Sequence, residues 1–264
     1  MTSDDITIHR GLTGVYFDRS ETTFIDGKEG VLEYRGYNIN ELAEHSTFEE
    51  TGYLLIHGKL PTQAELNEFD AELKAGRELP EQIFDVIELV KDSHPMDALR
   101  TAVSALAGFD PDRADNSAEA TIRKGNRLTS QVPAIVMAHH NIRQGKDPIK
   151  PSTTLNHAGN FLYMMDGNEP SSQAMNLMDK DFVLHADHGS NASAFTARVV
   201  AGTAADIHGA VTAGIAALSG PSHGGAAENV MQMAKEIGTA DRAADYVQNL
   251  LTNRERVMGF GHRV

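Results

Sequence analysis

Cysteine is absent from the 264 residues of the chain, and basic residues are scarce relative to acidic ones. Without cysteine, the chain can form no disulfide, no thiolate metal site and no thiol nucleophile. The 23 lysines and arginines face 37 aspartates and glutamates, which gives a formal net charge of −14. This balance argues against binding to nucleic acid or to an anionic membrane.

Signals of secretion and of membrane insertion are also missing. The first residues, Met1–Asp5, are polar and acidic, with neither the basic nor the apolar region of a signal peptide. The longest charge-free stretch, 207–227, contains a proline, two histidines and several glycines, which favours a buried helix followed by a loop. We therefore expect a cytoplasmic protein that binds neither nucleic acid nor membranes.

Two common functional motifs do not occur either. The chain has no Gly-x-Gly-x-x-Gly after a strand and no Gly-x-x-x-x-Gly-Lys-Ser/Thr. The usual indications of dinucleotide binding and of P-loop nucleotide binding are therefore lacking.

Most of the chain carries the capping signals and apolar periodicity of α-helices. Ser46–Glu49 and Thr62–Glu65 fit capping boxes, and each precedes apolar residues typical of a helix. Apolar residues at 84–90 indicate a further helix. Pro95 begins another, because proline is favoured in a first helical turn.

Strand signals are confined to the start of the chain. Short apolar runs at 15–17 and 31–34 flank the turn-forming residues 26–30, which predicts a small hairpin. The polar stretch 110–123 predicts a surface loop, and the small residues between 191 and 218 predict helices at the centre of a bundle. The expected fold is mainly α, a helical bundle with a short N-terminal β-hairpin.

Three segments place histidines among small residues: 185–193, 220–225 and 259–263. In the second, a proline breaks the preceding helix, and two glycines leave backbone N–H groups open around His223. Since the next helix is expected near Ala226, the positive end of its dipole disfavours a charged imidazole. A neutral histidine there can donate a hydrogen bond to a carbonyl oxygen that is becoming an enolate.

Each of these histidines, taken alone, also fits a structural role. His223 could cap a loop, and His262, which follows Gly259 and Gly261, could be exposed in a tight turn. His185 and His188 are three residues apart and would share one helix face, so zinc binding with a third histidine is a second hypothesis. No His-Glu-x-x-His pattern supports zinc, and a site for an organic anion is favoured.

Specific blocks occur along the whole chain in a fixed order. They are Arg35–Tyr37 with Glu41–Ala43, Leu54–Pro61, Ser93–Asp97 with Arg100–Ser104, His185–His188, Asn191–Thr196, Gly220–Gly225 and Arg256–His262. Together these blocks resemble the citrate synthase family, and within it the shorter bacterial and archaeal type, which includes 2-methylcitrate synthases.

The resemblance implies an acyltransferase that condenses acetyl-CoA with oxaloacetate and water to citrate and CoA, the first step of the tricarboxylic acid cycle. It implies two catalytic histidines, His223 at the thioester carbonyl and His262 at the oxaloacetate ketone. It also implies that His188 binds oxaloacetate and that no metal or other cofactor is needed. The loop that contacts CoA would consist of Arg256, Val257, Met258, Gly259 and Phe260.

The family fold implies a homodimer whose subunits have a large domain, here 1–219 with the hairpin, and a small domain that starts at 220 and reaches 264. Because family chains continue beyond the position of Val264, we expect a C-terminally truncated chain without the family's catalytic aspartate. Ala227 stands where the family usually has asparagine. Two alternatives stay open: a 2-methylcitrate synthase that uses propionyl-CoA, and an inactive binding or dimerisation fragment.

Overall fold

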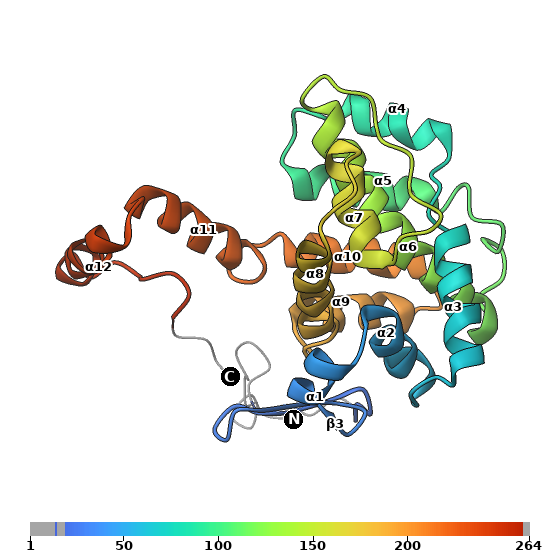
Figure 1. Cartoon of the computed structure of the whole chain (residues 1–264), viewed down its shortest axis with the longest axis horizontal. Coiled ribbons are helices and arrows are strands. Elements are labelled where there is room, and N and C mark those ends of the chain that lie inside the picture. The colour runs from blue at the N-terminus through green and yellow to red at the C-terminus, as the bar shows by residue number, and fades with distance from the viewer. Residues whose placement is uncertain (1–13, 15–18, 261–264) are drawn as a thin grey trace, which may run out of the picture.

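Twelve α-helices and a small sheet make up the part of the chain that the computed structural model describes, residue 14 and residues 19–260 (Figure 1). The mainly α-helical fold expected from the sequence is confirmed. The strands are β1 (Thr23–Asp26), β2 (Val31–Tyr34) and β3 (Tyr37–Asn38). The helices are α1 (Ile39–His45), α2 (Phe48–His57), α3 (Gln63–Ala75), α4 (Glu81–Leu89), α5 (Pro95–Leu106), α6 (Ala118–Ile142), α7 (His157–Asp166), α8 (Ser172–His185), α9 (Ala192–Ala201), α10 (Ile207–Leu218), α11 (Gly225–Ile237), the 3₁₀-helix η3 (Ala240–Arg242) and α12 (Ala243–Thr252).

The sheet is built from a hairpin and a tight turn. β1 and β2 pair antiparallel over their full lengths. Arg35 and Gly36, with φ of 51° and 84°, connect β2 to β3. Positive φ at both central residues is typical of a two-residue hairpin turn whose twist follows that of the strands. A hairpin is present about the predicted turn, but its first strand is β1 and not the predicted run at 15–17, which lies outside the described residues.

Capping boxes start two consecutive helices. Thr62 caps α3 as predicted, because its side chain accepts the Glu65 N–H while the Glu65 carboxylate accepts the Thr62 N–H. The box ahead of α2 is Thr47–Glu50, so the predicted box Ser46–Glu49 is wrong by one residue. Both pairs have the required spacing, but the Glu49 carboxylate is buried and accepts a backbone N–H of α7 at 2.7 Å.

The main hydrophobic core lies between α4, α5, α6 and α10. Its buried side chains are Ile83, Ile87, Ala102, Val103, Leu106, Leu128, Ile135, Ala138, Ile142 and Ile215. Burial of their apolar surface, worth about 25 cal/mol per Å², is the main stabilising term of this bundle. The core therefore holds α5 and α10 rigidly, and α10 leads directly into the candidate site.

The connection between α5 and α6 differs from the surface loop predicted at 110–123. α6 begins at Ala118 behind its N-cap Ser117, so the loop ends earlier than expected. Asp110 is buried and accepts hydrogen bonds from Arg127 Nε at 2.9 Å and Nη2 at 2.7 Å. Charges that looked solvated in the sequence are thus partly paired inside the fold, where an unpaired charge is costly.

α9 and α10 pack closely, as their small residues predicted. At Gly214 of α10, an added Cβ would lie 3.4 Å from the Ser193 carbonyl oxygen of α9, which is van der Waals contact between the two helices. α10 contains buried residues, whereas α9 contains none. The expectation that the whole stretch lies at the centre of the bundle is therefore wrong for α9, because close pairing of two helices does not require both to be covered.

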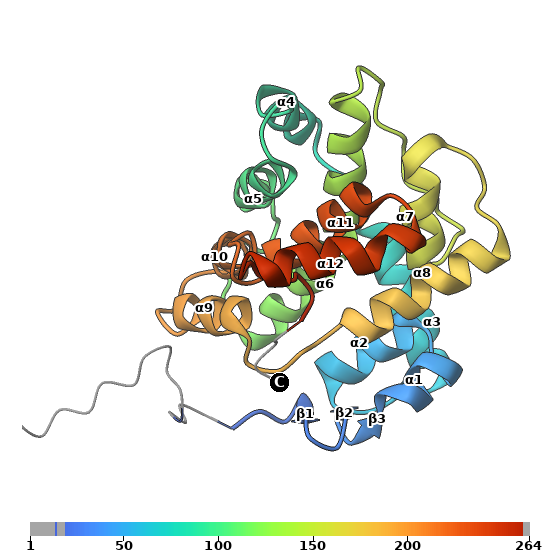
Figure 2. The ribbon, with the colours of Figure 1, turned by 90° about the vertical axis from the view of Figure 1, so that its left-hand side faces the viewer.

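α11 and α12 extend away from the other helices (Figure 1), and Figure 2 shows them in front of the rest of the molecule. Neither contains a buried residue in the described structure. α11 begins at Gly225, next to the start predicted near Ala226, and the turn between α10 and α11 carries His223. Within the described ranges, none of the helices combines the length and the hydropathy that crossing a membrane requires.

Candidate active site

His223 lies in a tight turn between α10 and α11. Its N–H donates to Gly220 O at 2.9 Å, and the Gly225 N–H donates to the same carbonyl at 3.2 Å. A Cβ at Gly224 would lie 2.6 Å from Leu218 O, closer than real side chains approach a backbone oxygen. The glycine after His223 is therefore required by the turn that presents the imidazole.

Ser193 links His223 to the start of α9. Its Oγ lies 3.0 Å from His223 Nε2 and donates to Asn191 Oδ1 at 2.6 Å. Asn191 is the N-cap of α9, and its Oδ1 also accepts the N–H groups of Ser193 and Ala194. The first turn of α9 thus restrains the imidazole through one serine hydroxyl. In the sequence, the only signal of this role was the Asn-x-Ser spacing at a helix start.

His188 and His185 do not share a helix face, so that prediction is wrong. α8 ends at His185, and residues 186–190 continue as an irregular segment in which Gly189 has a φ of 62°. Hydrogen bonds from the sheet to Asp187 draw the chain away from the helical path. His188 is exposed on this segment, which runs directly into the cap of α9 beside the His223 turn.

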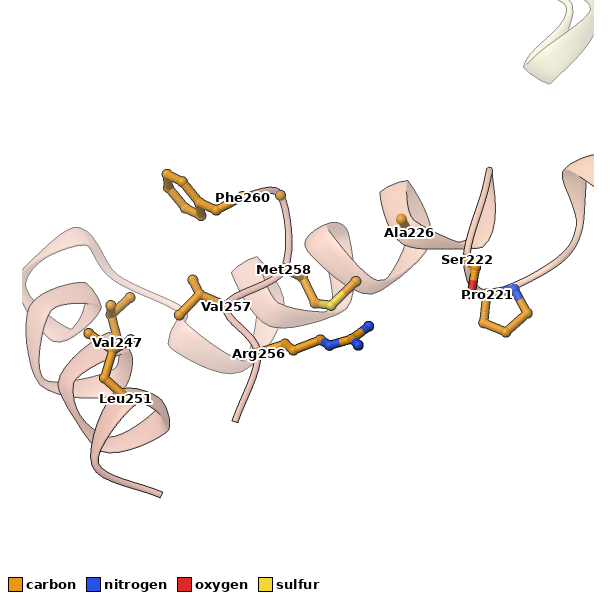
Figure 3. Close-up of a pocket in the computed structure, with 10 residues that line it drawn as sticks. Pro221, Ser222, Ala226, Val247, Leu251, Arg256, Val257, Met258 and Phe260 are labelled. Atoms are coloured by element: carbon orange, nitrogen blue, oxygen red, sulfur yellow. The ribbon is translucent and has the colours of Figure 1, made fainter. Parts of the chain in front are cut away.

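A cavity of about 950 Å³ opens beside the same turn. Its lining includes all five residues of the predicted CoA loop, together with the turn and α12: Pro221, Ser222, Ala226, Val247, Leu251, Arg256, Val257, Met258, Gly259 and Phe260. In Figure 3 the Arg256 guanidinium is directed toward Pro221 and Ser222, just before His223. The structure therefore brings the 256–260 segment and the His223 turn to one cavity, although they are far apart in the sequence.

Two parts of the predicted site stay predictions. His262 lies outside the described residues, so its position relative to His223 is not part of this geometry. The zinc hypothesis required a cluster of ligating side chains. In the described part of the chain, no group of three or more His, Cys, Asp or Glu side chains is arranged to hold a metal ion.

Known proteins share both this sequence and this fold. The family model described as "Citrate synthase, C-terminal domain" matches residues 11–264. The citrate synthase of Deinococcus radiodurans is 48% identical over 258 residues, which cover 97% of this chain and 68% of that protein. The crystal structure of citrate synthase from Pyrobaculum aerophilum has a TM-score of 0.92 and 39% identity, covering 100% of this chain and 68% of that one.

A third comparison includes ligands. The citrate synthase of the archaeon Thermoplasma acidophilum was solved as a ternary complex with carboxymethyl coenzyme A and oxaloacetate. It has a TM-score of 0.92 and 28% identity, covering 98% of this chain and 68% of that one.

These matches define the class of the protein, a mainly helical acyltransferase. The chain belongs to the citrate synthase family. The resemblance drawn from the ordered sequence blocks is confirmed, and so is the expectation that the chain is an enzyme of this kind.

Proposed function

We propose that the protein condenses acetyl-CoA with oxaloacetate and water to citrate and CoA, and that His223 is a catalytic residue. The observation that carries this proposal is the His223 turn, which holds the histidine against Ser193 beside a cavity of about 950 Å³. The reaction must stabilise the negative charge that develops on the thioester oxygen when the α-carbon loses a proton. A preorganised, uncharged hydrogen-bond donor beside that oxygen supplies this stabilisation.

The hydrogen bonds around Ser193 would hold His223 in place for this donation. Ser193 Oγ donates its one proton to Asn191 Oδ1 at 2.6 Å and lies 3.0 Å from His223 Nε2. Asn191 Oδ1 also accepts two backbone N–H groups. In this proposal, Ser193 therefore fixes the orientation of the imidazole.

The remaining roles follow the family assignment. His188 would bind oxaloacetate, and His262 would polarise its ketone and protonate the new alkoxide. Segment 256–260 would contact CoA, whose phosphates suit an arginine such as Arg256. The cavity lies within the roughly 300–1,000 Å³ typical of small-molecule sites. No step in this scheme uses a metal ion.

We also propose that residues 1–219 form the large domain and that 220–264 belong to a smaller one. In support, α11 and α12 have no buried residue in the described structure, and the chain reaches them through the short turn after α10. Movement about this turn would open and close the cavity. We further propose that the protein is a cytoplasmic homodimer. Light scattering of the purified protein tests the dimer, and a monomer mass would contradict it.

A thiol-release assay tests the proposed function. Purified protein is mixed with oxaloacetate and either acetyl-CoA or propionyl-CoA, and the released CoA is measured. We expect release that requires oxaloacetate and is faster with acetyl-CoA. Faster release from propionyl-CoA would assign the protein to 2-methylcitrate synthesis instead, and no release from either would refute the proposal.

A further inference from the structure

The N-terminal sheet contacts the segment that carries His188, and the first of these contacts comes from Tyr34. Its side chain is 0% exposed, and its hydroxyl lies 2.9 Å from Asp187 O and 3.2 Å from Leu184 O. The same oxygen accepts the Asp187 N–H at 3.2 Å. A single phenol thus bonds both backbone groups of the residue directly before His188.

The first strand of the hairpin adds two contacts to the same segment. Thr23 Oγ1 donates a hydrogen bond to Asp187 Oδ2. On the other side of His188, Ile25 of β1 is so close to Gly189 that an added Cβ there would lie 3.6 Å from Ile25 Cδ1. β1 and β2 therefore hold the chain on both sides of His188.

This support replaces the helix that would otherwise orient the histidine. α8 ends at His185, and α9 begins at Ala192. Between these helices the backbone has left regular structure, so its position depends on contacts from elsewhere in the fold. A ligand-binding side chain has to be held close to its productive geometry, because small displacements weaken binding and slow reaction.

We propose that Tyr34 and Thr23 are positioning residues that hold His188 in place for a dicarboxylate of the oxaloacetate type. This inference rests on the proposed role of His188 in substrate binding. The N-terminal sheet then serves the active site directly, in addition to packing on the hydrophobic cluster that contains Tyr34, Leu54 and Val183. Burial raises the pKa of the Tyr34 hydroxyl, which keeps it a neutral donor and acceptor at physiological pH.

Isosteric substitutions separate positioning from packing. Tyr34→Phe keeps the ring in the hydrophobic cluster but removes all hydroxyl contacts, and Thr23→Val removes the hydrogen bond to Asp187 with little change in shape. Tyr53→Phe is the matched control, because Tyr53 packs against His57 in α2, away from the 186–190 segment. Substrate affinities are measured by steady-state kinetics and by calorimetric titration with oxaloacetate. Amide hydrogen exchange of residues 185–190 is measured in parallel.

For Tyr34→Phe we expect the KM and Kd for oxaloacetate to rise about three- to tenfold, the usual effect of one lost hydrogen bond. The KM for acetyl-CoA should stay within twofold, amide exchange at 185–190 should accelerate, and Thr23→Val should shift the same quantities in the same direction. Equal losses for both substrates, or unchanged exchange at 185–190, would overturn the proposal. If Tyr34→Phe does not fold, the Thr23→Val results decide.

A failure of the proposed function can be told apart from a failure of this inference. A wild-type protein that neither binds nor turns over oxaloacetate would refute the role given to His188, and with it the dicarboxylate part of this inference. The exchange measurement would still decide whether the sheet holds the 185–190 segment, since faster exchange in both variants supports that part and unchanged exchange refutes it.

Discussion

Replacing Gly224 by alanine is a sharp test of the turn that presents His223. The new Cβ would lie 2.6 Å from both Leu218 O and Leu218 Cδ1, whereas ordinary contacts begin near 3.4 Å. The turn would therefore have to move by about 0.8 Å, the difference between these two distances. Because a displacement of about 1 Å in a catalytic arrangement can cost on the order of 10²-fold in rate, we expect a comparable loss of kcat.

The assay is thiol release at saturating acetyl-CoA and oxaloacetate, with a thermal unfolding curve for each variant. Gly209→Ala in the first turn of α10 is the matched control, because its Cβ would lie at an ordinary 3.7 Å from Asp206 Oδ2. Alanine inside a helix is favoured over glycine by roughly 0.5–1 kcal/mol, so this control should be at least as stable as wild type. A folded Gly224→Ala protein with wild-type kcat would refute the reasoning.

Three further predictions concern other contacts. Ser193→Ala removes the hydroxyl 3.0 Å from His223 Nε2 and should lower kcat by about tenfold, whereas Ser190→Ala should not. Equal rates in both variants would exclude the proposed role of Ser193 in orienting His223. His94 Nε2 lies 3.2 Å from both carboxylate oxygens of Glu228, while its Nδ1 caps α5. His94→Asn keeps a side-chain cap for α5 but loses the contact with the Glu228 carboxylate. Amide exchange should therefore accelerate in the first turn of α11 and stay unchanged in α5. An equal acceleration in α5 would show that His94 acts only as a cap. Burial lowers the pKa of His157 to about 4, so this ring binds a proton less readily in the folded chain than in the unfolded chain. Stability from this histidine is full above about pH 6.5 and falls as the pH drops toward 4. Between pH 7.5 and pH 4.5, the urea unfolding free energy of wild type should therefore fall by roughly 2–3 kcal/mol more than that of His157→Phe. Equal falls for both proteins would contradict the assignment.

Local signals were sufficient where neighbouring residues form the structure. The Thr62–Glu65 box, the turn-forming residues 26–30 and the proline after Gly220 each act within a few positions, so their elements could be predicted. Local signals failed where two possible capping boxes had the same residue spacing. Ser46–Glu49 and Thr47–Glu50 both fit a capping box, and a tertiary contact of Glu49 selected the second.

The candidate site was predictable in its residue types but not in its connections. His223 and the 256–260 segment stand out by their glycines. The structure places the 256–260 segment and the two residues before His223 at one cavity. The exit of His188 from α8 and the link from Ser193 to His223 depend on segments that meet only in the folded chain. Regular helical spacing alone suggested the opposite, that His185 and His188 face the same side.

The most direct measurement of the central claim is the steady-state thiol-release rate of His223→Ala beside that of wild type. His45→Ala is the control, since His45 is an exposed histidine at the end of α1. If His223 stabilises the developing enolate, kcat should fall by about 10²–10³-fold while the KM for oxaloacetate stays within a few fold. A His223→Ala protein that turns over at the wild-type rate would contradict the account.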